Sequence, residues 1–485
     1  MMLLSDLIEG LTGVRPARTA QTVRRFVIDS REVEPGDVFV ALAGEKTDGH
    51  QYVADAFSRG AVAALVERQP TLSRSPEHGE GTAEGGDVET MMVDALPGST
   101  APLAISLPVC LRVQRVQPAL QALARWWRSR FPALRVIGIT GSVCKSSTKE
   151  LAAAVLSRRF NVLKNEGNLN NEIGLPLTLL SLDTSHQRAV LEMGMYALGE
   201  LSMLCSIARP VIGVVTNVGP VHLERLGSIE AIARAKAELV EALPVEGVAI
   251  LNYDEPLVRQ MAALTKARVL FYGLDPEAEV WADNIRSEGL EGVYFDLHHR
   301  RETLHVQVPL LGRHSVHTAL RAAAVGLAEG MGWDQIVAGL QDRRAQLRLV
   351  AVPGPNGSTI LDDTYNASPA STIAALNLLA DLGGRKIAVL GDMLELGSFS
   401  EEGHRKVGLR ALDVADILVT VGELGALIGD EARRNGMPAD RLRICASNDE
   451  ATQFLTTLIR PGDMVLVKGS RGLHMEDIVI TLGQG

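Results

Sequence analysis

Short, almost uninterrupted apolar runs alternate with longer segments of helical periodicity from about residue 135 onward. A strand buried on both faces of a parallel sheet has such an apolar run, whereas an amphipathic helix repeats its apolar positions about every 3.6 residues. The alternation therefore predicts repeated strand–helix units. In this middle block the predicted strands are residues 136–140, 188–193, 211–217 and 247–251, and the predicted helices are residues 147–159, 199–208, 229–242 and 315–330.

The same alternation returns in the last third of the chain. Both blocks are therefore expected to be doubly wound α/β domains, in which ligands bind at the carboxyl ends of the strands. In this last block the predicted strands are residues 359–361, 386–390, 417–421 and 464–468, and the predicted helices are residues 371–382, 401–413 and 449–458.

The first block, up to about residue 134, has a weaker pattern. Residues 69–107 are rich in Ser, Gly, Glu, Pro and Thr with little periodicity, which predicts a flexible surface insertion without an assigned function. We expect three α/β domains, at 1–134, 135–342 and 343–485. In the first block the predicted strands are residues 26–29, 38–42 and 61–66, and the predicted helices are residues 53–59 and 118–130.

Composition and charge narrow the class of protein. The chain has 485 residues, of which 46% are hydrophobic and 22% charged, as is usual for a soluble globular protein. A net charge of -10 argues against a nucleic-acid partner. The sequence shows no signal-peptide pattern and no apolar run near the ~20 residues that cross a membrane. The four scattered cysteines indicate reduced thiols, so we expect a cytoplasmic protein, and we expect a monomer.

The most informative segment is residues 136–150, VIGITGSVCKSSTKE. An apolar strand there runs into a glycine, then a lysine with two hydroxyl residues, then a helix-forming segment, which is the order of a phosphate-binding loop. Lys145 would neutralise the phosphates and Ser146 would ligate Mg2+. However, Ile139 and Cys144 replace the glycines of the common P-loop. An ordinary strand-to-helix turn with a solvated lysine is therefore the alternative.

Other polar residues follow the later strands of the middle block. Glu192 and His222 come at the ends of two strands, where a carboxylate and an imidazole could hold Mg2+ directly or through water. Alone, either is more often a surface acid or a structural histidine. Because both follow strands that come after a phosphate loop, the interpretation as Mg2+-binding residues is favoured. Lys236 lies on a predicted helix, and by sequence alone it is a solvated lysine paired with an acid.

Three strand ends of the last block also carry polar residues. Two acids, an aromatic and an amide stand at residues 362–366, two acids stand at residues 391–397, and cations with small residues stand at residues 468–472. The last of these suits a carboxylate or phosphate ligand. Surface turns rich in Asp, Asn and Pro are the alternative for each.

Taken together, these motifs resemble those of the Mur ligases, which build the peptidoglycan precursor. The resemblance covers nearly the whole chain apart from the insertion. It is closest to the member that adds D-alanyl-D-alanine, because the motifs of the last block separate that member from its relatives. The matching segments are residues 29–31, 36–42, 44–45 and 48–50 in the first block, the loop at 167–176 in the second, and residues 363–369, 391–397 and 468–471 in the third.

The resemblance implies an N-terminal UDP-sugar-binding domain, a central P-loop ATPase domain and a C-terminal Rossmann-like ligase domain. It implies an ATP-dependent amide ligase that joins D-alanyl-D-alanine to UDP-N-acetylmuramoyl-tripeptide through an acyl phosphate. Lys145, His222 and Lys236 would be catalytic, and Lys236 matches a position that carries a carbamate in related ligases. Ser146, Glu192 and His222 would hold Mg2+.

The remaining implied roles fall into three groups of residues. ATP would contact Gly141, Ser142, Val143, Cys144, Lys145, Ser146, Ser147, Arg348 and Asp363; the UDP-sugar peptide would contact Ser30, Asn168, Asn170 and Asn171; and the dipeptide would contact Tyr365, Asn366 and Ser470.

The sequence departs from the family pattern at two places. The family loop reads T-G-S-N-G-K-T-T, whereas Val143 and Cys144 here replace the asparagine and the second glycine. A cysteine adds a Cβ and strains the loop if its φ is positive. The family's G-x-H-N-x-x-N helix start, which includes an adenine contact, has Ser315 and Thr318 in place of its asparagines. Both departures predict weaker nucleotide binding.

Two alternatives to this ligase therefore remain. One is a degenerate, non-catalytic binder of nucleotide or UDP-sugar; the other is a related ligase with a different amino-acid or peptide donor. The five residues Lys145, Glu192, His222, Lys236 and Asp363 favour an enzyme, because a site released from catalysis has no reason to keep them. The sugar motifs of the first block argue against folylpolyglutamate synthase, which lacks that domain.

Overall fold

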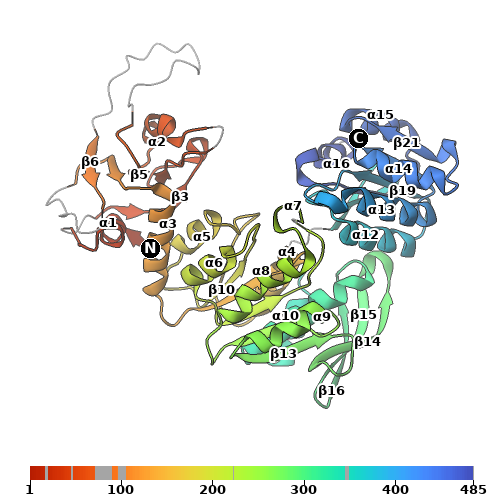
Figure 1. Cartoon of the computed structure of the whole chain (residues 1–485), viewed down its shortest axis with the longest axis horizontal. Helices are drawn as coiled ribbons and strands as arrows, with labels where there is room; N and C mark the ends of the chain where they lie inside the picture. The colour runs from red at the N-terminus through yellow and green to blue at the C-terminus, as the bar shows by residue number, and fades with distance from the viewer. Residues whose placement is uncertain are drawn as a thin grey trace, which may run out of the picture. The chain divides into compact units, whose positions relative to one another are not determined.

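The chain, seen in a computed structural model, folds into two compact units (Figure 1). Unit 1 comprises Met1–Val136, Asn161–Met193 and Ser202–Arg209, and unit 2 comprises Ile137–Phe160, Gly194–Leu201 and Pro210–Gly485. The structure describes residues 1–16, 20–44, 47–70, 90–96, 105–221, 223–343 and 349–483.

Unit 1 is built on a parallel sheet of five strands in the order β3-β4-β5-β7-β6. The strand β6 lies within the segment predicted to be a flexible insertion, so that prediction was wrong at this point. Four residues are too few to show a period, and their pairing with β7 is what makes them a strand. The bounds are β3 Phe26–Val27, β4 Val38–Val40, β5 Ala63–Val66, β6 Met91–Asp94 and β7 Val109–Arg112.

Two helices of unit 1, α1 (Leu4–Thr12) and α3 (Val116–Ser129), pack closely because Gly10 has no side chain. A Cβ on Gly10 would lie 2.6 Å from Leu123 Cδ1, closer than atoms can approach. The buried Arg128 of α3 binds backbone carbonyls, including that of Ala208 at 3.1 Å. Burial lowers the pKa of Arg128 to about 10.

Unit 1 also contains the parallel strands β9 (Val162–Lys164) and β10 (Arg188–Glu192) and the helix α5 (Gly174–Leu180). The strand predicted at 188–193 is thus confirmed. The sequence did not predict β9, because only three residues of it are hydrogen-bonded and none of the three is buried.

The middle part of unit 2 is a mixed sheet that includes the order β16-β15-β14-β13-β12-β11-β8. The pairs from β8 to β14 are parallel, whereas β14, β15 and β16 are antiparallel neighbours. The sequence did not predict this antiparallel extension. The bounds are β8 Arg135–Thr140, β11 Ile212–Val215, β12 Val248–Asn252, β13 Arg268–Gly273, β14 Val280–Ser287, β15 Val293–His299 and β16 Glu302–Val308.

The helices α4 (Lys145–Leu156), α8 (Ile229–Glu241), α10 (Val316–Ala328) and α11 (Trp333–Leu340) belong to this middle part. The predicted helices at 147–159, 229–242 and 315–330 are therefore confirmed to within a few residues. The site depends on the four residues 141–144 between β8 and α4, of which only Gly141 is a glycine.

The C-terminal part of unit 2 is a doubly wound sheet in the order β17-β18-β22-β19-β20-β21, with only β17 antiparallel. Neighbouring residues of one strand face opposite sides, so Leu390 packs with α12–α14 and Val389 with α15 and α16. The bounds are β17 Val350–Pro353, β18 Thr359–Asp362, β19 Lys386–Gly391, β20 Ile417–Val421, β21 Leu442–Cys445, β22 Met464–Lys468, α12 Pro369–Asp381, α13 Ser400–Val414, α14 Gly425–Arg434, α15 Asn448–Leu458 and α16 Glu476–Gly483.

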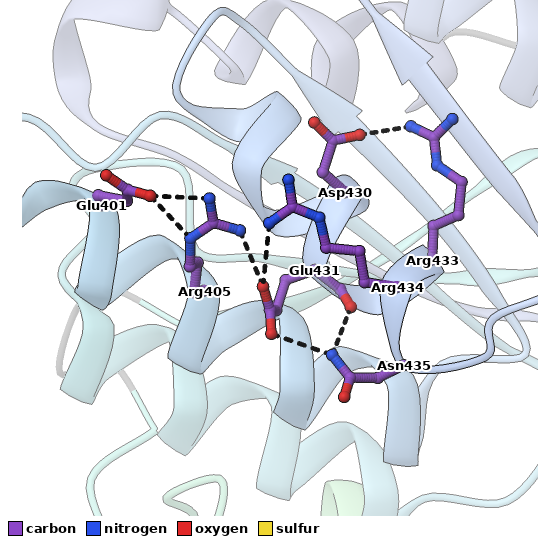
Figure 2. Close-up of polar contacts among 7 residues, drawn as sticks. All are labelled: Glu401, Arg405, Asp430, Glu431, Arg433, Arg434 and Asn435. Carbon is purple, nitrogen blue, oxygen red and sulfur yellow. Dashed lines mark hydrogen bonds and ion pairs between the residues drawn. The ribbon is translucent and has the colours of Figure 1, made fainter.

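An ion-pair network joins α13 to α14 at the surface (Figure 2). Arg405 binds Glu401 at 2.7 Å on its own helix and Glu431 at 2.8 Å on α14. Because acids and bases alternate in the network, this surface carries paired charge and is no cationic or anionic patch. Its members are Glu401, Arg405, Glu431, Arg434 and Asn435, and Asp430 and Arg433 form a separate ion pair beside it.

A buried histidine holds the loop that follows β19. His404 Nε2 accepts a hydrogen bond from the N–H of Met393 at 2.9 Å, and His404 Nδ1 donates to the carbonyl of Ser400 at 2.6 Å. The contact with Met393 requires a neutral ring, because a protonated Nε2 cannot accept a hydrogen bond. Burial lowers the pKa of His404 below its ordinary value.

We predict that His404 makes the protein less stable in mild acid. The unfolded chain protonates this histidine near pH 6.5, before the folded protein does. The free energy of unfolding should therefore fall as the pH drops below about 6.5, by at most ~1.4 kcal/mol per pH unit, until the folded protein is protonated too. Thermal unfolding at pH 7.5 and 5.5 would show a smaller loss for His404→Gln than for wild type.

The exposed His305 provides a control, because it is 84% exposed. His305→Gln should lose as much stability between pH 7.5 and 5.5 as the wild-type protein does. If His404→Gln keeps that response as well, His404 does not titrate as proposed.

Candidate functional site

The loop between β8 and α4 folds as the sequence predicts for a phosphate-binding loop. Gly141 has a φ of 150°, and a Cβ there would lie 1.8 Å from Thr216 Oγ1. Only glycine therefore allows the loop to lie against the end of β11. Thr216 Oγ1 in turn donates a hydrogen bond to the carbonyl of Val143 at 2.7 Å.

Asn217 makes a second connection between the loop and the end of β11. Its Oδ1 accepts hydrogen bonds from the N–H groups of Ser142 at 3.1 Å and Val143 at 2.9 Å. Ser142 Oγ is also bonded to Gly219. The sequence analysis did not assign a role to Thr216 or Asn217, although both stand at a strand end, where that role could have been sought.

Cys144 adopts the left-handed conformation, with φ 63° and ψ 13°, immediately before α4. The sequence made this strain conditional on a positive φ, and the structure meets that condition. This conformation costs a residue with a Cβ about 1 kcal/mol more than glycine. Something else in the fold must stabilise the loop in this shape.

Lys145 begins α4 and folds back over the loop, with its Nζ 2.8 Å from the carbonyl of Gly141 and 3.2 Å from that of Ser142. Ser146 follows and is buried, whereas Ser147 is half-buried. The helix N-terminus, the ammonium group and the Ser146 hydroxyl together form a set of groups suited to a phosphate with its Mg2+.

Lys236 of α8 is 2% exposed, so the interpretation as a solvated lysine was wrong. Burial lowers the pKa of Lys236 well below its ordinary value, and the positive charge of Lys145 lowers it further. The two amines are therefore close enough to interact. A pattern of surface-like neighbours in the sequence could not reveal that the fold encloses this position.

Glu192 lies in unit 1 and is also buried. Asn170 Nδ2 donates to Glu192 Oε1 at 2.9 Å, and Asn165 binds the Glu192 backbone at 2.9 Å and 3.0 Å. Asn171 Oδ1 accepts from the N–H of Gly174 at 2.8 Å and so caps α5, while the Asn168 carbonyl accepts from the N–H of Asn170 at 2.7 Å. The structure thus brings Asn170 and Glu192 together.

The predicted residues of the C-terminal part also meet one another. Asp363 Oδ2 forms an ion pair with the buried Lys468 Nζ at 2.7 Å, and this amine also donates to the carbonyl of Asn366 at 2.8 Å. Arg471 lies over the ring of Tyr365, with 5.6 Å from its Cζ to the ring centroid. Lys468 and Arg471 thus join the two strand-end motifs.

Ser470 and Ser30, two further predicted site residues, are both buried. Ser470 Oγ accepts a hydrogen bond from the N–H of Leu394 at 2.9 Å, so it holds the loop after β19. Ser30 begins a short 3-10 turn in unit 1 that Asp29 caps. The predicted roles of both in substrate binding stay predictions. His222 and Arg348 lie outside the described residues.

A pocket of about 100 Å³ lies within unit 2 beside the phosphate loop. Its wall on the other side is the start of α12, where Ser368 caps the helix. Glu255 also lines it, and burial raises the pKa of that carboxyl. The lining residues are Ser142, Val143, Asn217, Val218, Gly219, Pro220, Val221, Glu255, Ser368, Pro369 and Ala370.

Next to Glu255, Asp254 accepts hydrogen bonds from His317 Nε2 at 2.8 Å and from the N–H of Leu274 at 2.8 Å. Although burial opposes the effect, these bonds lower the pKa of Asp254. The sequence analysis did not name Asp254, Glu255 or His317. Asp254 and Glu255 follow β12, so the strand-end rule could have found them, whereas His317 lies on α10.

The two replaced asparagine positions at the start of α10 engage the protein itself. Ser315 Oγ donates to the carbonyl of Gly312 at 2.6 Å, and Thr318 Oγ1 accepts a hydrogen bond from Arg321 at 2.7 Å. Within the ranges that the structure describes, no group of three or more His, Cys, Asp or Glu side chains could hold a metal ion. None of the described helices is long and apolar enough to cross a membrane.

Models of known protein families match each of the three parts of the chain. The model of the Mur ligase middle domain matches residues 139–326, that of the Mur ligase glutamate ligase domain matches residues 343–471, and that of the Mur ligase catalytic domain matches residues 22–125. The chain belongs to the Mur ligase family. The predicted family and its three-domain α/β fold are thereby confirmed, whereas the domain boundaries stay predictions.

Individual Mur ligases match the chain over nearly its full length. The UDP-N-acetylmuramoyl-tripeptide–D-alanyl-D-alanine ligase of Bacillus subtilis is 34% identical over 98% of this chain and 96% of its own. A MurF crystal structure from Acinetobacter baumannii is 30% identical, covers 100% of this chain and 99% of its own, and has a TM-score of 0.82. The MurF ligase of Thermotoga maritima in complex with ADP is 26% identical, covers 96% and 99%, and has a TM-score of 0.75.

We predict that Cys144→Gly stabilises the phosphate loop of this Mur ligase. Glycine adopts the left-handed conformation without the penalty of a Cβ, so the free energy of unfolding should rise by about 0.5–1 kcal/mol. Chemical denaturation of the purified protein would measure the change.

The matched control is Cys144→Ala, which removes the thiol and keeps the Cβ. It should not stabilise the protein. Equal stabilisation by both variants would mean that the thiol, and not the backbone conformation, is responsible.

Proposed function

We propose that this chain joins D-alanyl-D-alanine to UDP-N-acetylmuramoyl-tripeptide at the expense of ATP, in peptidoglycan precursor synthesis. The observation that supports it most is the phosphate loop: Lys145 and Ser146 start α4 beside a pocket in a chain that matches dipeptide-adding Mur ligases from end to end. We propose that the reaction takes place in the cytoplasm. The four cysteines all lie within the described residues and form no disulfide, which suits a reducing compartment.

The residues present fit a nucleotide triphosphate with Mg2+. Lys145 and the N-terminus of α4 would hold the phosphates, and the hydroxyl of Ser146 would reach the metal. ATP supplies the activation that a carboxylate needs before an amine can displace one of its oxygens. The γ-phosphoryl group is transferred to the tripeptide carboxylate, the dipeptide nitrogen then bonds to the acyl carbon, and phosphate leaves while the amine loses a proton.

The protein's contribution to this chemistry is chiefly positioning and charge. Lys145 would face the negative charge of the phosphates, and Glu192 and His222 would hold Mg2+. Once carbamylated, as the resemblance implies, Lys236 would become an anion. Its lowered pKa supports this, because carbamylation requires the neutral amine.

The substrate contacts stay those that the resemblance implies. Ser30, Asn168, Asn170 and Asn171 would contact the UDP-sugar peptide, and Asn170 is already bonded to Glu192. Tyr365, Asn366 and Ser470 would contact the dipeptide. The neighbouring Arg471 is a cation that suits its carboxylate. Arg348 and Asp363 would contact the nucleotide.

The decisive assay measures phosphate release from ATP with UDP-N-acetylmuramoyl-tripeptide, with and without D-alanyl-D-alanine. The proposed ligase should release phosphate steadily only when both are present. If phosphate is released steadily when another amino acid or dipeptide replaces D-alanyl-D-alanine, and not with D-alanyl-D-alanine itself, the protein is a Mur-type ligase with a different donor. No release with any donor would identify the degenerate binder.

We predict that Lys145→Ala lowers turnover in this assay by about 10²- to 10³-fold, because it removes the main countercharge of the phosphates. Circular dichroism should show an unchanged fold. Lys406→Ala is the matched control, since Lys406 lies on the surface of α13 in a pair with Glu402. If Lys145→Ala retains near wild-type turnover, Lys145 is outside the nucleotide site.

We also predict that iodoacetamide inactivates the enzyme through Cys144 and that MgATP protects it. Of the four cysteines, Cys144 is half-buried and the other three are buried. Mass mapping should find the label at Cys144, and Cys144→Gly should keep its activity in the reagent. Loss of wild-type activity without a label at Cys144 would contradict the prediction.

A further inference from the structure

Arg321 of α10 is the largest of the side chains that the described structure buries almost completely, with 2% exposure. Its guanidinium donates three hydrogen bonds, to Thr148 Oγ1 at 2.8 Å, Thr318 Oγ1 at 2.7 Å and Tyr272 Oη at 3.3 Å. In the part of the chain that the structure describes, no carboxylate is hydrogen-bonded or ion-paired to it. Buried charges are normally neutralised by a counter-ion, so this arrangement requires an explanation.

Two chains of hydrogen bonds lead from Arg321 to the phosphate loop. In the first, Thr148 accepts from Arg321 and donates to the carbonyl of Cys144 at 2.7 Å. In the second, Tyr272 accepts from Arg321 and donates to the carbonyl of Thr216 at 3.0 Å, and Thr216 Oγ1 donates to the carbonyl of Val143 at 2.7 Å. Arg321 thus lies behind the carbonyls on both sides of the strained Cys144.

These contacts fix the direction of two backbone N–H groups. A trans peptide is planar and its C=O and N–H point in opposite directions. With the carbonyls of Val143 and Cys144 held toward the interior, the N–H groups of Cys144 and Lys145 point to the other side of the loop. That side is where the start of α4 would present its amides to a phosphate.

The charge of Arg321 adds to this effect. Its neighbour Tyr272 is fully buried, and burial raises the pKa of that phenol to about 12, so the ring is neutral and does not cancel the charge. The guanidinium lies 5.6 Å from the centre of the same ring. In a site of low dielectric, a cation behind the loop attracts an anion in front of it.

We propose that Arg321 is a positioning residue for the nucleotide phosphates. It fixes the two peptide groups that flank Cys144, and its buried charge awaits the phosphates as its counter-ion. The inference rests on the proposed function, because it requires that a nucleotide binds at this loop. A residue that only filled space would need neither the charge nor the two connections.

Calorimetric titration with ADP, without turnover, tests the inference. Arg321→Met keeps the length of the side chain and removes its charge and hydrogen bonds, so the Kd for ADP should rise about tenfold. Arg321→Lys keeps the charge but cannot reach three hydroxyl groups. Its Kd for ADP should therefore lie between those of the wild type and Arg321→Met. The Kd for UDP-N-acetylmuramoyl-tripeptide should stay within twofold of the wild type in both.

Arg128→Met is the matched control, because Arg128 is also buried and donates only to backbone carbonyls in unit 1. It should lower the melting temperature and leave the Kd for ADP unchanged. If Arg321→Met fails to fold, Thr148→Val and Tyr272→Phe each cut one chain of hydrogen bonds and should each raise the Kd for ADP about threefold.

An unchanged Kd for ADP in a folded Arg321→Met protein would overturn the inference, as would an equal rise in both Kd values. When Arg321→Met does not fold, an unchanged Kd in both Thr148→Val and Tyr272→Phe would overturn it as well. These outcomes leave the proposed function intact. If the wild-type protein itself binds no ADP, the proposed function fails together with the inference.

Discussion

The left-handed backbone at Cys144 is the constraint around which this site is organised. The peptide groups on either side of it have to be held in place, and hydroxyl groups of Thr148 and Thr216 hold both carbonyls. The strain of about 1 kcal/mol is comparable to one or two such hydrogen bonds. The loop shape therefore comes from the surrounding fold, whereas a glycine would have permitted it locally.

Buried and half-buried cations are the second feature of this site. Lys145, Lys236 and Arg321 lie in one part of unit 2, and two of them are almost completely buried. Burial lowers the pKa of Lys236, which shows how unfavourable a charged amine is there. Bound phosphates would neutralise Lys145 and Arg321, whereas the neutral amine of Lys236 is the form that carbamylation requires. A site that is electrostatically unfavourable when empty is thereby suited to bind a multiply charged anion.

In the C-terminal part of the chain, by contrast, charged side chains form ion pairs with one another. Its acids and cations neutralise each other at Asp363 and Lys468, and the surface network of α13 and α14 does the same (Figure 2). The groups that join the two strand-end motifs, Asp363, Lys468 and Arg471, lie where a sheet of this kind binds its ligand. The doubly wound topology explains this, because it gathers the carboxyl ends of the strands at one edge.

The sequence by itself determined the repeated strand–helix units, the family and the replacement of a loop glycine by Cys144, because periodicity, motif order and residue type are local properties. It could not determine that Lys236 is enclosed, that β14 to β16 form an antiparallel extension, or that Met91–Asp94 is a strand. Nor could it show that Arg321 supports a loop whose Thr148 lies 173 residues earlier. Burial and pairing over such distances depend on which surfaces the folded chain brings together, and only the tertiary structure decides that.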